Sequence, residues 1–400
     1  MNSRQIADNI HALSVDDHST PLFEGLWPVQ PGGVTYNSYV IIDEKNVIID
    51  LTREFKAETL LEAVSSIVDL AKIDYLVVNH MEPDHSGALR TLVRIAPNVK
   101  IICTPAATAM LESYYSIKTN IHEAADGEKL KIGKKTLVFH HTPLVHWPET
   151  MVTFEETTGT LFSCDLFGSY GAATEQVYDD ELSNIDEYLK ESLRYFSNIL
   201  AKFSPQVGKA VELARRLAPK VIAPSHGTIW RKDPGRIVEL YGKWAGYGST
   251  GGEPGVTLIY ASMYGNTAEA MNAVVRGLAS ASVTANVFNV NETHLSHILP
   301  SLWVNRGVVI GSPTYEGNIF PGIRHVLIDA GAKRIFGKSA AFFGSWSWSS
   351  GALREITNVV KPFHWEVKEA LEFEGAAKED VMRKAFELGA AFGKRIKAGK

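Results

Sequence analysis

Residues 75–88 read YLVVNHMEPDHSGA and leave a buried-strand pattern to present several potential metal ligands. The apolar run YLVV is typical of a strand inside a sheet. The next residues supply four side chains that commonly bind metals: His80, Glu82, Asp84 and His85. Buried carboxylates and imidazoles this close together are costly to pack unless a cation binds them. The stretch therefore predicts a metal site where a buried strand ends.

Three further candidate ligands follow at strand ends or in a loop. His146 lies in the loop PLVHWPET, Asp165 follows the apolar strand of LFSCDLFG, and His226 follows the strand of VIAPSHGTIW. No local structure brings together residues so far apart along the chain, so we expect a fold in which several strand ends converge.

The candidate ligands divide into two sets that share one residue. The first set is His80, Glu82 and His146. The second set is Asp84 and His226, with His85 as a further candidate. Asp165 can bridge the two, because a carboxylate has two oxygens that can bind separate ions. Imidazoles and carboxylates without a thiolate suit iron, manganese or zinc, and the carboxylate of Glu82 favours an iron pair.

Composition narrows the class of protein. The chain has 400 residues, a net charge of -5 and a 45% hydrophobic fraction, which fits a globular protein without a nucleic-acid-binding surface. No apolar run is long enough to cross a membrane, and the segment MNSRQIADNI lacks signal-peptide features. Cys103 and Cys164 are the only cysteines. They exclude a rubredoxin-like iron site within these 400 residues and favour a cytoplasmic location.

The composition changes once, at GYGSTGGEPGV (246–256). We interpret this segment as a linker between domains 1–250 and 251–400. It contains a literal G-x-G-x-x-G, but a helix pattern precedes it and a strand follows, the reverse of a dinucleotide site. The first part has more strands than helices, typical of stacked sheets flanked by helices. The second part alternates strand and helix, typical of a parallel, doubly wound sheet.

Three loops of the second part each follow an apolar strand at its carboxyl end, where ligands of open α/β sheets bind. They are SMYGNT (262–267), GSPTYEGNIFP (311–321) and GSWSWSSGA (344–352). The first resembles the FMN phosphate loop of flavodoxins, from which Tyr264 departs, and the absence of Lys excludes a Walker loop. The candidate FMN-binding residues are Ser262, Met263, Tyr264, Gly265, Asn266, Thr267, Ser312, Pro313, Thr314, Tyr315, Gly317, Asn318, Gly344, Ser345, Trp346, Trp348, Ser349 and Gly351.

The whole pattern resembles the flavodiiron proteins (A-type flavoproteins). The resemblance rests on the order H-x-E-x-D-H, VHWP, a strand-end Asp and SHG, followed by the flavin loops, and it extends to YNSYVI, RYFSNIL and GSPTYEGN. It implies an α/β chain in which a metallo-β-lactamase-like αββα sandwich precedes a flavodoxin-like doubly wound parallel sheet. It also implies two iron ions and one FMN per chain.

The resemblance further implies an oxidoreductase that reduces dioxygen to water, nitric oxide to nitrous oxide, or both. We slightly favour the reduction of dioxygen. The residues assigned to iron ligation are His80, Glu82, Asp84, His146, Asp165 and His226. Members of the family form head-to-tail homodimers, here expected as a dimer or a dimer of dimers, and the electron donor is expected to be rubredoxin or a similar redox protein.

One segment departs from the family pattern. Many members have D-W-x-x-R-x-F-H-G, whereas this chain has LFEGLWPVQPGG (22–33), without the His. We expect Glu24 and Trp27 to occupy part of the wall of the iron pocket. Two alternatives remain open: a zinc metallohydrolase with a fused flavodoxin domain, and an FMN electron carrier.

Overall fold

The computed structural model describes residues 2–172 and 176–399, which divide into two compact units, residues 1–243 and 244–400. The predicted domain limit after residue 250 coincides with the end of α7 (Pro234–Thr250) and stays a prediction. In the described part of the chain, no helix has both the length and the apolar character needed to cross a membrane.

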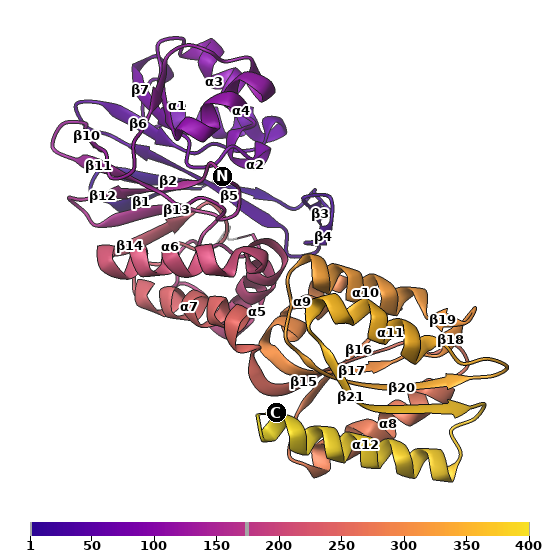
Figure 1. Ribbon diagram of the computed structural model, residues 1–400. Coiled ribbons are helices and arrows are strands. Elements are labelled where there is room, and N and C mark those ends of the chain that lie inside the picture. The colour runs from indigo at the N-terminus through magenta and orange to yellow at the C-terminus, as the bar shows by residue number, and fades with distance from the viewer. Residues whose placement is uncertain (1, 173–175, 400) are drawn as a thin grey trace. The chain divides into compact units, whose positions relative to one another are not determined.

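The first unit contains two stacked sheets (Figure 1). The seven-stranded sheet consists, in spatial order, of β1 (Asn2–Ala7), β2 (Ile10–Asp17), β5 (Val34–Ile41), β6 (Asn46–Ile49), β7 (Ile73–Val77), β8 (Lys100–Cys103) and β9 (Ile121–Glu123). The five-stranded sheet consists of β10 (Lys129–Lys131), β11 (Thr136–His141), β12 (Met151–Glu155), β13 (Thr160–Cys164) and β14 (Val221–Pro224). All eight residues of β5 are buried, as expected for a Val-, Ile- and Tyr-rich strand between two packed layers.

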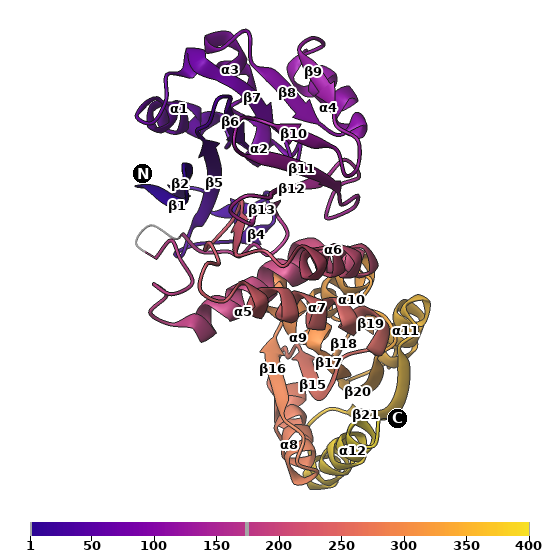
Figure 2. The same ribbon diagram turned by 90° about the vertical axis from the view of Figure 1, so that its left-hand side faces the viewer.

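Helices cover both outer faces of the two sheets (Figures 1 and 2). One face carries α1 (Ala57–Ser65), α3 (Leu89–Ile95) and α4 (Pro105–Tyr115), and the other carries α6 (Ser204–Leu217) and α7. One apolar core lies between the first sheet and its helices, and a second core lies between the sheets, where Tyr39, Phe139 and Phe162 pack together. This arrangement confirms the predicted αββα sandwich.

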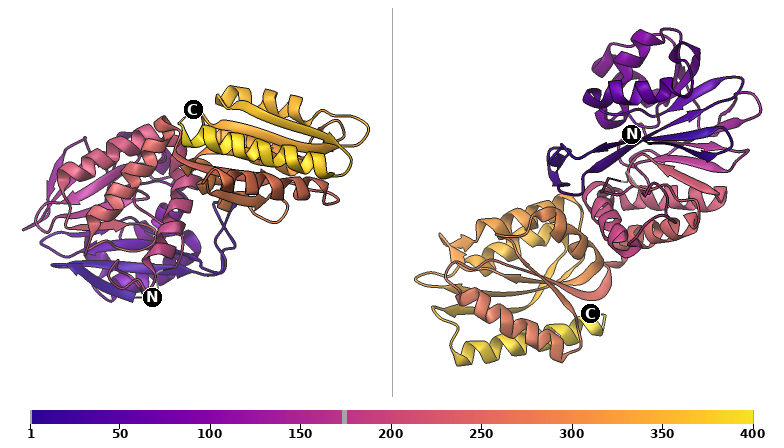
Figure 3. Two further views of the ribbon diagram at one scale, coloured as in Figure 1. Left: turned by 90° about the horizontal axis from the view of Figure 1, so that it is seen from below. Right: turned by 180° about the vertical axis from the view of Figure 1, so that it is seen from behind.

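The second unit is a five-stranded parallel sheet with helices on both faces. Its strands lie in the order β16 (Ala285–Asn289), β15 (Glu253–Tyr260), β17 (Asn305–Gly311), β20 (Ser339–Trp346) and β21 (Glu366–Glu374). This is the 2-1-3-4-5 order of flavodoxin-like folds. The helices α8 (Asn266–Ser280) and α12 (Glu379–Lys397) pack side by side on one face (Figure 3). The other face carries α9 (Leu295–Val304), α10 (Pro321–Ala332) and α11 (Ala352–Val360). The predicted doubly wound sheet is confirmed.

The segment 246–256 differs from its interpretation as a flexible linker. The helix α7 continues to Thr250 and β15 begins at Glu253, so little irregular chain remains. Glycine in a helix costs about 1 kcal/mol relative to alanine, but Trp244 and Tyr247 of this helix are buried, and burial outweighs the local preference of Gly246 and Gly248.

Two further elements depart from the sequence pattern. The helix α5 (Ile185–Tyr195) passes directly into a fully buried π-helical turn, Phe196–Leu200, and does not continue as a regular α-helix. The helix α9 was not predicted, because it contains Pro300. Proline usually ends a helix pattern, but seven buried residues hold α9 against the sheet.

Candidate functional site

The strand ends of the first unit bring the predicted metal ligands together. His80 and Glu82 follow β7, and Asp84 and His85 lie in the short helix α2 (Pro83–Ser86). His146 lies in the loop between β11 and β12. Asp165 follows β13 directly, and His226 follows β14 after one residue.

The first set of ligand atoms surrounds one oxygen of Asp165. His146 Nε2 lies 3.0 Å from Glu82 Oε2 and 3.2 Å from Asp165 Oδ2. His80 Nε2 lies 3.2 Å from the same Glu82 oxygen and 3.4 Å from Asp165 Oδ2. The ligand atoms of these four residues all lie within 4.8 Å of one another, which is close enough for them to share one ion.

The second set surrounds the other oxygen of Asp165. His85 Nε2 lies 3.0 Å and His226 Nε2 3.3 Å from Asp165 Oδ1. Asp84 completes the set, with Oδ2 3.3 Å from His226 Nε2 and Oδ1 3.4 Å from His85 Nε2. The bridging position predicted for Asp165 is therefore sterically available, and His85 lies with the other candidates rather than apart from them.

Electrostatics favour cations at both positions. Burial alone would lower the pKa of His146 and His226, but the nearby carboxylates of Asp165 and of Glu82 or Asp84 raise these values to about 9 and about 10. Burial would raise the pKa of Asp165, but the charge of His85 and the close imidazoles of His146 and His226 hold it well below its usual value. The buried carboxylates thus require positive charge nearby, which two metal ions would supply.

Several buried atoms have no hydrogen-bond partner among the described residues. They are Asp84 Oδ1, Asp165 Oδ1, His226 Nε2 and both ring nitrogens of His85. Such atoms are costly to bury unless something else coordinates them. The two sets therefore fit a pair of metal ions, and the donors, all oxygen or imidazole nitrogen, suit iron. Cys164 also lies close to His85 and Asp165, but burial and the charge of Asp50 raise the pKa of its thiol well above normal.

Two residues outside the ligand set orient the imidazoles. His80 Nδ1 donates to Glu149 Oε1 at 2.7 Å, and the same oxygen accepts the backbone N–H of Met81 at 3.0 Å. His226 Nδ1 donates to the carbonyl oxygen of Thr35 at 2.9 Å. These bonds leave each Nε2 with its lone pair toward the metal position, the usual arrangement for metal-binding histidines. Glu149 was not predicted, although it lies in the quoted stretch PLVHWPET, three residues after a ligand.

Aromatic rings cover the second set. Phe23 meets the ring of His226 edge-on at 5.2 Å, and Tyr36 and Tyr195 lie 5.6 and 5.7 Å from it. Phe23 belongs to the segment 22–33, and it contacts the ring of His226. In the same segment, Trp27 Nε1 donates a hydrogen bond to Glu24 Oε2 at 2.9 Å.

The other set is covered by Trp147, whose ring lies 5.1 Å from that of His80. The two rings pack edge-on, with an interplanar angle of 87°.

Tyr195 is a second residue that the ligand pattern missed. Its side chain is fully buried, and its hydroxyl has no hydrogen-bond partner among the described residues. Burial and the charges of Asp165 and Tyr241 raise its pKa well above the usual value. It directly precedes the π-helical turn Phe196–Leu200, and such turns are frequent at functional sites. Only the fragment RYFSNIL in the sequence pointed to this region.

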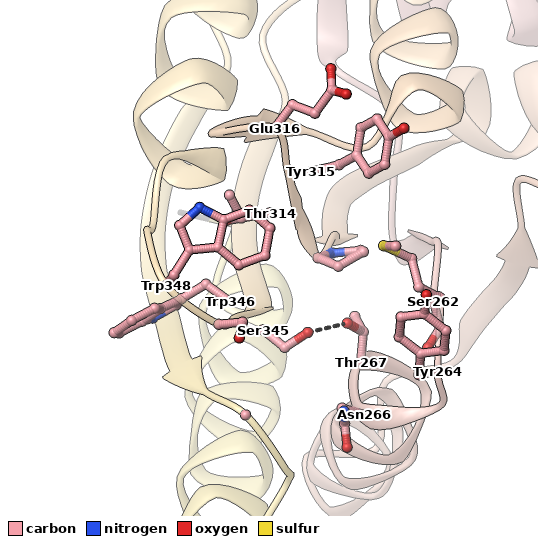
Figure 4. A pocket seen from close by; sticks show the side chains of 14 residues that line it. Ser262, Tyr264, Asn266, Thr267, Thr314, Tyr315, Glu316, Ser345, Trp346 and Trp348 are labelled. Atoms are coloured by element: carbon pink, nitrogen blue, oxygen red, sulfur yellow. Dashed lines mark hydrogen bonds between the residues drawn. The ribbon is translucent and has the colours of Figure 1, made fainter.

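The second unit has a cavity of about 610 Å³ at the carboxyl ends of its strands (Figure 4). This volume is typical of cofactor sites. The residues that line it are Ser262, Met263, Tyr264, Asn266, Thr267, Pro313, Thr314, Tyr315, Glu316, Ser345, Trp346, Ser347, Trp348 and Gly375.

Eleven of the predicted flavin contacts line the cavity, and seven do not. The seven are Gly265, Ser312, Gly317, Asn318, Gly344, Ser349 and Gly351. Glu316, Ser347 and Gly375 line it without having been predicted. Gly375 follows β21, a strand end that carried no recognisable loop motif.

The cavity has the chemistry of a flavin mononucleotide site. Asn266 and Thr267 begin α8, and backbone N–H groups at a helix start can bind a phosphate. Gly265 has φ +97°, a conformation that favours glycine and lets the chain turn tightly into the helix. Thr267 Oγ1 and Ser345 Oγ lie 3.0 Å apart across the cavity floor (Figure 4). Aromatic rings from the loops after β17 and β20 offer flat faces to an isoalloxazine ring.

Comparisons with known proteins agree with the folds of both units. Residues 34–227 match the model of the ODP family beta lactamase, and residues 258–389 match that of flavodoxin. The nitric oxide reductase of Moorella thermoacetica is 31% identical over 98% of each chain. The rubredoxin oxygen:oxidoreductase of Desulfovibrio gigas is 26% identical with a TM-score of 0.94, covering 100% of this chain and 99% of that one. The flavodiiron protein of Giardia intestinalis is 28% identical with a TM-score of 0.93, covering 100% and 98%.

Proposed function

Because this chain belongs to the flavodiiron protein family, we propose that it reduces dioxygen to water, nitric oxide to nitrous oxide, or both, at a non-haem diiron site re-reduced by FMN. The chain is an oxidoreductase of that family, and we favour dioxygen as its main substrate. One observation carries the proposal: two ligand sets meet at the two oxygens of one buried carboxylate, Asp165.

The cofactors of the family are FMN and a pair of iron ions, and the residues of this chain fit both. For the first iron we propose His80, Glu82 and His146 as ligands. For the second we propose Asp84, His226 and also His85, whose Nε2 has no hydrogen-bond partner among the described residues. Asp165 would bridge the two irons.

When bound, reduced FMN and the ferrous pair can supply four electrons, enough to convert one dioxygen and four protons into two waters. Two nitric oxides need only two electrons and two protons to give nitrous oxide and one water. Asp165 holds the two metal positions close together, and Phe23 and Trp147 keep bulk water from the site. The hydroxyl of Tyr195 holds a proton at Oη beside this pocket, and we propose that it donates that proton to the substrate.

The second unit supplies the flavin end of the electron path. We propose that FMN binds with its phosphate at the start of α8 and its ring between the loops after β17 and β20. The relative from Desulfovibrio gigas is named a rubredoxin oxygen:oxidoreductase, which supports rubredoxin or a similar redox protein as the electron donor. We also propose a head-to-tail homodimer, or a dimer of dimers, in which the flavin of one chain serves the iron pair of the other.

Metal analysis and rapid mixing test the proposal. The purified protein should contain about two irons and one FMN per chain, and after anaerobic reduction its flavin should reoxidise far faster than free FMN on mixing with dioxygen or nitric oxide. Steady-state turnover of both gases with one artificial donor ranks the substrates. Two zinc ions and no iron would instead favour a metallohydrolase. Flavin reoxidation no faster than that of free FMN would favour an electron carrier.

We expect Glu149→Gln to weaken iron binding by about 10- to 100-fold, the usual effect of removing a group that orients a metal-binding histidine. The neutral amide would no longer fix the tautomer of His80 as the charged carboxylate does. Iron retained after dialysis against a chelator measures the effect. Glu156→Gln is the control, because Glu156 is exposed and pairs with Lys129 away from the site. Equal iron retention in both variants would refute the orienting role.

A further inference from the structure

One wall of the flavin cavity is a hairpin too small to be stable alone. The strands β18 (Thr314–Tyr315) and β19 (Asn318–Ile319) have two residues each. Glu316 and Gly317 connect them with φ of +50° and +75°, as in the type I′ turns of tight hairpins. Isolated hairpins are marginally stable at best. Other parts of the chain must therefore fix this hairpin in place.

Three contacts hold the hairpin, and two come from the start of α11. At the tip, the backbone of Gly317 packs so closely on Gly351 that a Cβ added there would lie 2.0 Å from the Gly317 carbonyl oxygen. At the base, the N–H of Phe320 donates to Ser312 Oγ at 3.0 Å. Also at the base, the N–H of Ile319 donates to Glu355 Oε2 at 2.6 Å.

Glu355 is well placed to hold the hairpin. It lies in the first turn of α11, where the helix dipole favours a carboxylate, and its side chain is only 17% exposed. Its second oxygen pairs with the guanidinium of Arg324 on α10. Because Ile319 is buried, its N–H would have no obvious replacement partner if the carboxylate were lost.

The start of α11 is also connected to another wall of the cavity. The strand β20 ends with Trp346, and the loop from β20 into α11 carries Trp348. Both tryptophans line the cavity, as does Tyr315 of the hairpin (Figure 4). Glu355 does not line the cavity itself, yet it joins the hairpin to the helix that this loop enters.

We propose that Glu355 is a positioning residue. It sets the spacing between Tyr315 and the two tryptophans, Trp346 and Trp348, and thereby the affinity for the flavin ring. The inference rests on the proposed function, since it takes the cavity to be the FMN site.

The test compares flavin affinity in full-length variants stripped of FMN. We expect Glu355→Ala to raise the Kd for FMN by about tenfold, equivalent to ~1.4 kcal/mol. The Kd for riboflavin should rise by the same factor, because Glu355 acts on the ring end and not on the phosphate. Glu355→Gln should bind within about threefold of the wild type, because its amide oxygen can still accept the Ile319 N–H. Fluorescence quenching of the titrated flavin measures each Kd.

Two controls separate positioning from general destabilisation. Glu387→Ala on α12 removes an exposed ion pair with Arg383 and should leave flavin affinity unchanged. The Tm of each variant is measured with and without FMN. Positioning predicts that Glu355→Ala shrinks the Tm gain caused by FMN, whereas a purely structural role lowers both Tm values equally.

A second variant keeps the inference falsifiable if Glu355→Ala does not fold. Gly351→Ala retains the ion pair but pushes the hairpin tip away from the helix, so it should weaken flavin binding too. Wild-type flavin affinity in Glu355→Ala or in Gly351→Ala would overturn the inference. If the wild-type protein binds no FMN, it is the proposed function that fails.

Discussion

Asp165→Asn is expected to abolish the iron pair and to slow gas reduction by more than about a hundredfold. Asp165 is 1% exposed, and each of its oxygens faces a different ligand set. Asparagine has only one acceptor oxygen, and its amide N–H₂ cannot bind a cation. Even the loss of groups that only orient ligands costs 10- to 100-fold, so the loss of a bridging ligand should cost more. Iron content per chain and anaerobic stopped-flow mixing with each gas measure the effect.

The matched control for this variant is Asp186→Asn. Its side chain is 86% exposed at the start of α5, so the same chemical change there should leave iron content and turnover unaltered. FMN content should remain normal in both variants, since the flavin cavity is formed by residues of the second unit. A fully active Asp165→Asn protein with two irons would refute the bridging role.

Tyr195→Phe is expected to keep both cofactors and lose at least about a hundredfold in gas reduction, the lower range for removal of a general acid. Phenylalanine preserves the ring packing against Phe23, Tyr170 and His226. Only the hydroxyl is lost, and that hydroxyl has no hydrogen-bond partner among the described residues. Turnover under saturating reductant, with iron and FMN quantified in the same sample, measures the change.

The control for Tyr195→Phe is Tyr241→Phe, which removes the hydroxyl of another buried tyrosine. Unlike that of Tyr195, this hydroxyl donates a hydrogen bond within the described part of the chain. The hydroxyl of Tyr241 donates to the carbonyl oxygen of Gly168 at 2.7 Å. Removing this hydroxyl should therefore mainly lower the melting temperature and have a smaller effect on the turnover number. If Tyr195→Phe turned over at the wild-type rate with full cofactor content, proton donation by Tyr195 would be wrong.

The sequence predicted the chemical nature of both sites because most of the candidate ligands follow strands. An apolar run that ends in His80 and Glu82, and others that end in Asp165 and His226, indicate side chains collected at one edge of stacked sheets. Alternation of strands and helices likewise predicted the parallel sheet, and strand–loop–helix order predicted where a flavin would lie. These signals are local, since hydrophobic periodicity and turn residues act over short stretches.

Where local signals compete with packing, the sequence pattern was less reliable. Gly246 and Gly248 indicated a loop, yet they lie within α7, and Pro300 concealed α9. In both helices the burial of neighbouring apolar side chains outweighs the intrinsic cost of a glycine or a proline.

By itself, the sequence predicted which side chains bind metal and flavin, and it determined in what order the two folds occur. Only the tertiary structure decided that Asp165 directs one oxygen to each ligand set, that Glu149 and the Thr35 carbonyl orient two imidazoles, and that the ring of Tyr195 packs beside His226. It also decided that Glu355 fastens the flavin hairpin. Such relations join residues distant along the chain, so no periodicity encodes them, and they arise when burial brings polar groups together that must find partners.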